Sequence, residues 1–166
     1  MIKRTSKSIG TISYNTPLFL TNQLNELITS EKIVFYAYIV HKGEGTDKDH
    51  AHVFVEPNGS IDVANLRKTF DEPIKDGKPL GCMPFVPSDF NNWYLYSSHD
   101  YDYLTAKHEE KEVYDYQFTD FVTSNREELK NRVDGIDRTK YQSDFSRVIY
   151  CIEHGMNMGQ AIIYLR

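Results

Sequence analysis

Long apolar runs are absent from this 166-residue chain. A membrane-spanning helix needs roughly 20 consecutive apolar residues, and no stretch of the sequence approaches that length. The first ten residues, MIKRTSKSIG, include basic side chains but lack the apolar segment that follows them in a secretory signal. The sequence therefore predicts neither a membrane span nor an exported protein, and we expect a cytoplasmic one.

Cysteine is scarce. The two cysteines, Cys82 and Cys151, lie far apart in the sequence and form no CxxC pair. This pattern excludes a disulfide framework and gives no indication of a zinc site built from thiolates. We expect both side chains to be buried thiols.

An excess of positive charge is missing as well. The chain has 19 Lys and Arg against 24 Asp and Glu, which gives a formal net charge of −5. Proteins that coat nucleic acid non-specifically do so by neutralising many phosphates, so this balance argues against such a role. Local recognition stays open, because small groups of basic residues occur at 3–7, 67–68 and 126–140.

Strand and helix patterns alternate along the chain, which has no internal repeat and reads as one domain with a core. β-Branched and aromatic residues predict strands at 8–15, 32–41, 50–56, 80–85 and 112–118. Apolar spacing and capping residues predict three helices, which start near Thr21 or Asn22, near Ser60 or Asp62, and at Ser88 or Asp89. The third of these helices is expected to run to residue 100. Two more helices are predicted at 125–134 and 143–165. We therefore expect an α+β fold, an antiparallel sheet with helices packed on one face.

Histidines gather around the predicted hairpin of 32–41 and 50–56. His50 and His52 share one face of their strand, because successive side chains alternate between faces. His41 ends the preceding strand and Glu44 lies in the turn, so all four side chains could reach one ion. Imidazoles with a carboxylate suit manganese, cobalt or zinc better than calcium. A solvated hairpin would have the same composition, and the turn contains two competing acids, Asp47 and Asp49.

A later helix carries two tyrosines in the sequence FNNWYLYSSHD. Tyr94 and Tyr96 are separated by roughly 200° around a helix, so they cannot share a face. Tyr94 falls on a stripe with Phe90, which predicts packing, whereas Tyr96 falls with the polar His99 and Asp100. Tyr96 is therefore the better candidate to face a polar site, although an amphipathic helix with no catalytic role would show the same spacing.

These motifs together resemble a known family. HAH at 50–52 fits the HUH pattern of two histidines around a usually hydrophobic residue, and YLYSSHD is similar to the tyrosine helix YLYLTHE of RepB-type replication initiators from rolling-circle plasmids of Gram-positive bacteria. The family's upstream histidine and acid correspond to His41 and Glu44, and its nucleophile to Tyr96. KHEEKEVYDY resembles the family's segment ending in VYD, so the likeness spans roughly 8–120. The family usually has aspartate where Glu44 stands.

The resemblance implies a ferredoxin-like HUH endonuclease in the bacterial cytoplasm. Such an enzyme uses Mn²⁺ or Mg²⁺, here on His41, Glu44, His50 and His52, to nick a single-stranded or extruded replication origin. Tyr96 would form a 5′-phosphotyrosyl link and free a 3′-hydroxyl, with His99 or Asp100 assisting. The expected partners are origin DNA, the host replication helicase and polymerase, and further copies of the chain.

The resemblance also implies that the chain consists of two parts. Residues 1–122 would form the nuclease and origin-binding domain. Residues 123–166 would be a helical segment that either packs on the nuclease or leads to an oligomerisation domain.

Two other functions fit parts of the pattern. His50, His52 and Glu56 also read as HxHxxxE, close to the first motif of cupin metal enzymes. The chain could alternatively be a DNA-binding module without catalysis. A structure would favour the cupin if Glu56 rather than Tyr96 lay beside the histidines, and the non-catalytic module if Tyr96 could not reach them.

Overall fold

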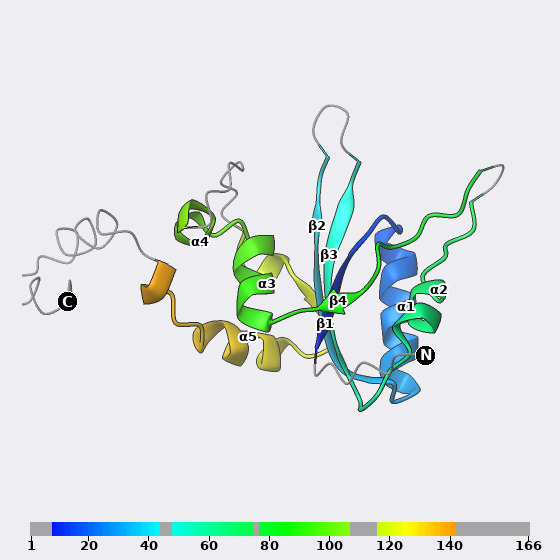
Figure 1. Ribbon diagram of the computed structural model, residues 1–166, viewed down its shortest axis with the longest axis horizontal. Coiled ribbons are helices and arrows are strands. Elements are labelled where there is room, and N and C mark those ends of the chain that lie inside the picture. Colours follow the sequence, from blue (N-terminus) through cyan, green and yellow to red (C-terminus); the bar gives the residue numbers. More distant parts are fainter. Residues whose placement is uncertain (1–7, 44–47, 75–76, 107–115, 142–166) are drawn as a thin grey trace, which may run out of the picture.

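A computed structural model describes residues 8–43, 48–74, 77–106 and 116–141 (Figure 1). Its centre is a five-stranded sheet with the strand order β4-β1-β3-β2-β5, in which all paired strands are antiparallel. The strands are β1 (Ile9–Ser13), β2 (Ile33–His41), β3 (His50–Pro57), β4 (Val86–Pro87) and β5 (Val122–Thr123).

Polar caps start most of the helices. The helices are α1 (Pro17–Thr29), α2 (Val63–Lys68), α3 (Phe90–Ser97), α4 (Tyr101–Ala106) and α5 (Arg126–Asp134), with 3₁₀ turns η1 (Phe118–Asp120) and η2 (Thr139–Tyr141). In four helices a side chain just before the helix accepts a hydrogen bond from a backbone N–H of the first turn. These side chains are Thr16 for α1, Asp62 for α2, Asp89 for α3 and Asn125 for α5. Such caps satisfy donors that the helix itself leaves unpaired.

The predicted α+β class is confirmed. The first six regular elements run β1-α1-β2-β3-α2-β4, the order of a ferredoxin-like unit. β3 lies between β1 and β2, so the long β2–β3 hairpin forms the middle of the sheet. The end of this hairpin carries the three histidines.

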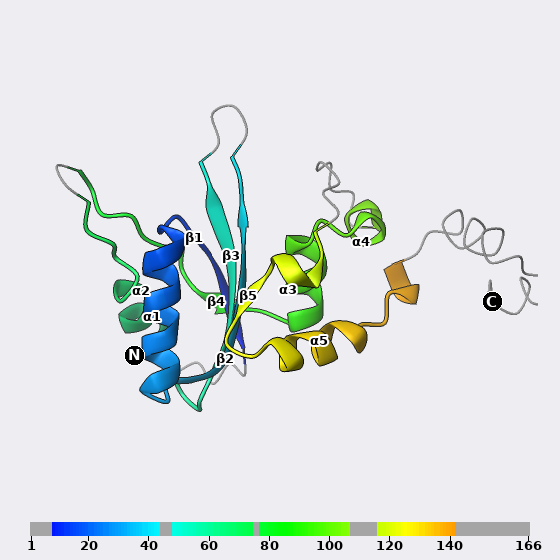
Figure 2. The ribbon, with the colours of Figure 1, turned by 180° about the vertical axis from the view of Figure 1, so that it is seen from behind.

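Helices cover both faces of the sheet, so the prediction that they pack on one face is wrong. Figures 1 and 2 show α1 and α2 on one side of the sheet and α3 and α5 on the other. Alternate residues of the central strands point into two separate cores. Tyr38 and Val53 lie in the core with α1, whereas Ile39 and Phe54 lie in the core with α3. The strands need two helical layers because both of their faces are apolar.

The first helix begins earlier than predicted. It starts at Pro17 rather than after Thr21 or Asn22, because Thr16 supplies the cap and proline is well tolerated in the first turn. The predicted strand at 80–85 is also wrong, since the segment forms only isolated bridges and the edge strand is β4, immediately after it.

The tyrosine helix is shorter than predicted. α3 ends at Ser97 and α4 begins at Tyr101, with His99 in the left-handed region at a φ of 56°. Of the predicted strand at 112–118, residues 112–115 lie outside the described residues. Residues 116–118 form no strand, and the other edge of the sheet is β5 instead.

The C-terminal part of the described chain belongs to the sheet domain. β5 pairs with β2, and Leu129 and Val133 of α5 lie in the core beneath α3. The boundary expected after residue 122 therefore falls inside a strand, and the helix predicted at 125–134 is confirmed. The helix predicted at 143–165 lies outside the described residues.

Two sequence predictions concern burial. The Cys82 side chain is 5% exposed, and burial raises the pKa of its thiol to about 11, so this cysteine is the buried thiol expected. Cys151 lies outside the described residues. Among the residues that the structure describes, no helix has the length and apolar character to cross a membrane.

Candidate metal centre and adjacent tyrosine

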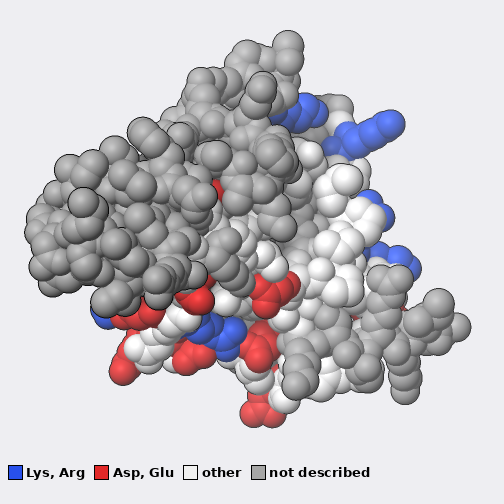
Figure 3. All heavy atoms as spheres, turned by 60° about the vertical axis from the view of Figure 1, so that its left-hand side comes forward, with Lys and Arg blue, Asp and Glu red and all other residues white. Residues whose placement is uncertain are grey.

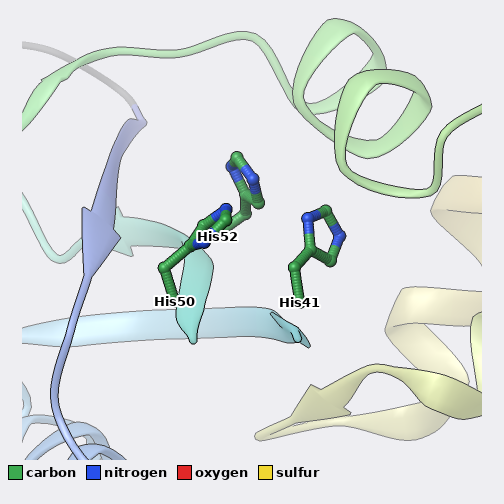
Figure 4. A group of neighbouring side chains, drawn as sticks. All are labelled: His41, His50 and His52. Atoms are coloured by element: carbon green, nitrogen blue, oxygen red, sulfur yellow. The ribbon is translucent and has the colours of Figure 1, made fainter. Parts of the chain in front are cut away.

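Three histidines converge where the β2–β3 hairpin leaves the helical layers. His41 lies directly opposite His50 in the register of the antiparallel pair, and His52 follows two residues later on the same face. One nitrogen from each ring lies within 4.8 Å of the others. Figure 4 shows that His41 comes from one strand and the other two from its neighbour. Strand pairing alone thus builds a site that could hold a metal ion.

Hydrogen bonds orient two of the rings. His41 Nε2 lies 2.8 Å from the carbonyl oxygen of Ser97, and His50 Nδ1 lies 3.0 Å from that of Lys48. A carbonyl can only accept, so these nitrogens carry the protons. In the neutral rings His41 Nδ1 and His50 Nε2 then have the lone pairs that a metal requires. The donor set fits a divalent transition ion, because it consists of three imidazoles and two of them have their other nitrogen bound to a backbone carbonyl.

The carboxylate ligand is less defined than the histidines. Glu44 and Asp47 lie outside the described residues. Asp49 accepts hydrogen bonds from Lys42 Nζ at 2.7 Å and from the backbone N–H of Gly43 at 2.9 Å. The hydrogen bond from Lys42 lowers the pKa of Asp49. The Asp49 carboxylate therefore links the two ends of the hairpin turn. Within the described ranges, the cluster consists of the three histidines.

The two tyrosines of α3 have separate environments. Tyr94 is 3% exposed, and its ring stacks on Phe121 with centroids 4.9 Å apart. Burial raises the pKa of Tyr94, which makes its phenolate harder to form. Tyr96 is half-buried, and its ring lies edge-on to His52 with centroids 5.6 Å apart. The structure therefore brings Tyr96, and not Tyr94, to the histidine cluster.

The two residues expected to assist Tyr96 have different partners. His99 packs against His41 with ring centroids 4.6 Å apart. Asp100 accepts from the backbone N–H of Tyr103 at 3.0 Å, which caps α4, and from Arg138 Nε at 3.3 Å. Asp100 thus has a structural role at the α3–α4 junction, whereas His99 belongs to the aromatic surroundings of the histidine cluster.

Sequence reasoning missed Tyr116 and the carbonyl of Ser97. Tyr116 stacks on His41, with centroids 5.1 Å apart and an interplanar angle of 6°. Its segment, VYDY, lies in the strand predicted at 112–118 and in the family likeness, but neither placed Tyr116 beside His41. No spacing rule links it to His41, which lies 75 positions earlier, so only the fold could bring the two rings together.

Glu56 lies away from the metal centre. It shares the histidines' face of β3, but its carboxylate accepts from Arg132 of α5 at 2.6 Å. Arg132 also donates to Glu128 at 2.6 Å, and its guanidinium lies 4.4 Å from the centroid of the Phe35 ring. Glu56 therefore helps to dock α5 on the sheet, which is the arrangement that disfavours the cupin interpretation.

This docking contact leads to a stability prediction. We expect Arg132→Ala to lower the free energy of unfolding by about 2 kcal/mol, because it leaves the Glu56 carboxylate half-buried without its partner. Lys130→Ala is the matched control on the same helix. Its ion pair with Asp134 is exposed, so the loss should be no more than about 0.5 kcal/mol. Urea denaturation of both variants measures the difference, and equal losses would contradict the docking role of Arg132.

The described residues on the face shown in Figure 3 form no single large basic patch. Figure 3 shows Lys and Arg side chains spread along one margin of the visible face, with acidic and basic groups intermixed below. This distribution agrees with the net charge of −5. Among the described residues, a nucleic-acid contact on this face would be made by a few separate side chains.

Comparison with protein-family models gave no match, and comparison with curated proteins gave no significant match. Function is therefore inferred from the residues and geometry described above.

Proposed function

We propose that this protein is a metal-dependent DNA endonuclease that nicks one strand at a replication origin and joins the cut DNA to Tyr96. The observation that carries the proposal is the contact of the Tyr96 ring with His52, at the edge of three convergent histidines. A phenol beside a metal site is what a tyrosine nucleophile in phosphoryl transfer requires. The motif resemblance supports the same assignment.

Each residue has a defined part in this reaction. His41, His50 and His52 would hold Mn²⁺ or Mg²⁺, with Glu44 as the expected fourth ligand. When bound, the ion would supply positive charge that stabilises the negative charge developing on the scissile phosphate. α3 would orient Tyr96 toward that phosphate, and the buried Tyr94 holds the helix on the core.

The proposed reaction exchanges one bond to phosphorus for another. The phenolic oxygen of Tyr96 forms a bond to phosphorus while the bond from phosphorus to the 3′-oxygen breaks. Tyr96 loses its proton, with His99 or Asp100 as the proposed assistants, and the leaving oxygen gains one to become a 3′-hydroxyl. The phosphoester is retained as a 5′-phosphotyrosyl link, so the cut can later be rejoined, and the free 3′-hydroxyl could be extended by a host polymerase behind a host helicase.

The substrate would be single-stranded when cut. Several aromatic side chains surround the histidines, and one of them, Tyr14, is 39% exposed with its ring 6.4 Å from that of His50. Aromatic rings of this kind stack on unpaired bases. We therefore propose an extruded or melted origin as the target. The resemblance adds further copies of the chain as partners, through its C-terminal part.

Incubation with labelled single-stranded oligonucleotides tests the proposal. The oligonucleotides should tile the DNA that flanks the gene, and reactions should contain Mn²⁺ or a chelator. We expect a covalent protein–DNA adduct only with the metal, together with a second fragment that a polymerase can extend. Metal binding without any adduct would favour a metal enzyme of another kind, and an adduct insensitive to chelation would remove the ion from the mechanism.

A further inference from the structure

The chain leaves α3 through a left-handed residue that is not glycine. Among the described residues, two non-glycine positions have positive φ: Glu31 at 54° and His99 at 56°. Each stands directly after the C-cap residue of a helix. Glycine is the usual residue at this point because a Cβ is strained in the left-handed region. A histidine here therefore has a conformational cost that glycine would not have.

The backbone at the end of α3 forms a Schellman motif. The N–H of Asp100 donates to the carbonyl of Leu95 at 3.0 Å, and the N–H of His99 donates to that of Tyr96 at 3.2 Å. This pair of hydrogen bonds requires a left-handed residue at position 99. The turn therefore fixes the direction in which the His99 side chain leaves the helix.

The end of α1 has the same motif. The N–H of Lys32 donates to the carbonyl of Leu27 at 2.9 Å, and the N–H of Glu31 donates to that of Ile28 at 3.0 Å. Glu31 is exposed. The two helix ends thus share one backbone conformation and differ in what surrounds the left-handed side chain.

His99 packs on a proposed metal ligand. Its ring stands edge-on to His41 at 4.6 Å between centroids, and edge-on to Tyr116 at 5.6 Å. Tyr116 in turn stacks on His41, whose Nε2 donates to Ser97 O. Besides the two other histidines of the cluster, the rings of His99 and Tyr116 and the hydrogen bond to Ser97 restrain the His41 ring. Two of these restraints, Ser97 and His99, come from the end of α3, which carries Tyr96, and from the turn directly after it.

We propose that His99 is a positioning residue of the metal centre, kept in a strained glycine position so that its ring holds His41 in the orientation that binds the ion. This inference rests on the proposed metal site and deepens it. A ligand held in advance loses little freedom when the ion binds, which raises affinity. The same turn would also set the position of Tyr96 relative to His41, so that nucleophile and ligand are placed by one element.

The test compares His99→Gly with Glu31→Gly. Both substitutions put glycine in a left-handed Schellman position, so we expect both variants to unfold at the wild-type temperature or above it. Only His99→Gly removes a ring from His41. We expect it to weaken Co²⁺ binding by about tenfold or more and to alter the visible absorption of the bound cobalt, whereas Glu31→Gly should match the wild type in both.

The outcomes separate this inference from the proposed function. If His99→Gly binds Co²⁺ with wild-type affinity and spectrum, His99 is only a helix-capping residue and the inference is overturned. If the wild type binds no Co²⁺, the metal centre itself is wrong. Should His99→Gly unfold, His99→Asn replaces it, because asparagine tolerates the left-handed region without supplying the ring. Co²⁺ binding by His99→Asn with wild-type affinity would also overturn the inference.

Discussion

Replacing Tyr96 by phenylalanine is expected to abolish the covalent DNA adduct and to reduce nicking by about 10⁴-fold or more, as loss of a nucleophile does. The substitution removes one hydroxyl and keeps the ring that lies beside His52, so the metal centre should persist. Gel analysis of the labelled adduct measures the loss, and Co²⁺ binding by the same variant shows whether the site is intact.

Tyr94→Phe is the matched control for this experiment. Tyr94 lies two residues earlier on the same helix, but its ring is buried between Phe90 and Phe121. The variant keeps that packing, so we expect the adduct to form at a rate close to that of the wild type. The assignment of the nucleophile fails if Tyr96→Phe still yields the adduct and Tyr94→Phe does not.

His50→Ala should weaken metal binding by at least about 100-fold and abolish metal-dependent nicking. His50 is the most suitable of the three histidines for this test because it is half-buried, whereas His41 and His52 are only 5% and 7% exposed. Its loss therefore removes a ligand with little effect on packing. Calorimetric titration with Mn²⁺ or Co²⁺ gives the affinity, and circular dichroism should show an unchanged fold.

Glu56→Gln is the control that separates the two enzyme interpretations. Glu56 lies on the same face of β3 but is paired with Arg132. We expect its substitution to lower stability while metal affinity stays at the wild-type level. Loss of metal affinity in Glu56→Gln as well as in His50→Ala would favour the cupin-type site over the three-histidine centre.

The hairpin histidines were predictable because local geometry decides them. Side chains alternate along a strand, so His50 and His52 had to share a face. The two strands were predicted to form a hairpin, so His41, at the end of the first strand, was expected near them. The separation of Tyr94 from Tyr96 follows in the same way from the turn angle of a helix, which is why one tyrosine is in the core and the other beside the histidines.

Contacts between distant segments were not predictable from spacing. Glu56 has the position of a metal ligand in the sequence pattern, yet Arg132, 76 residues later, pairs with it. The second helical layer was missed for a related reason: an apolar strand face indicates that something covers it, but not which helix does so.

The sequence by itself determined the α+β class, the β2–β3 hairpin, the shared face of His50 and His52, and the polar side of α3. These features depend on backbone periods that act over a few residues. Only the tertiary structure decided that His41 lies opposite His50, that Tyr96 and His99 meet the histidines, and that Glu56 does not. Those contacts depend on strand register and on the docking of α3 and α5 against the sheet, which arise from packing of the whole core.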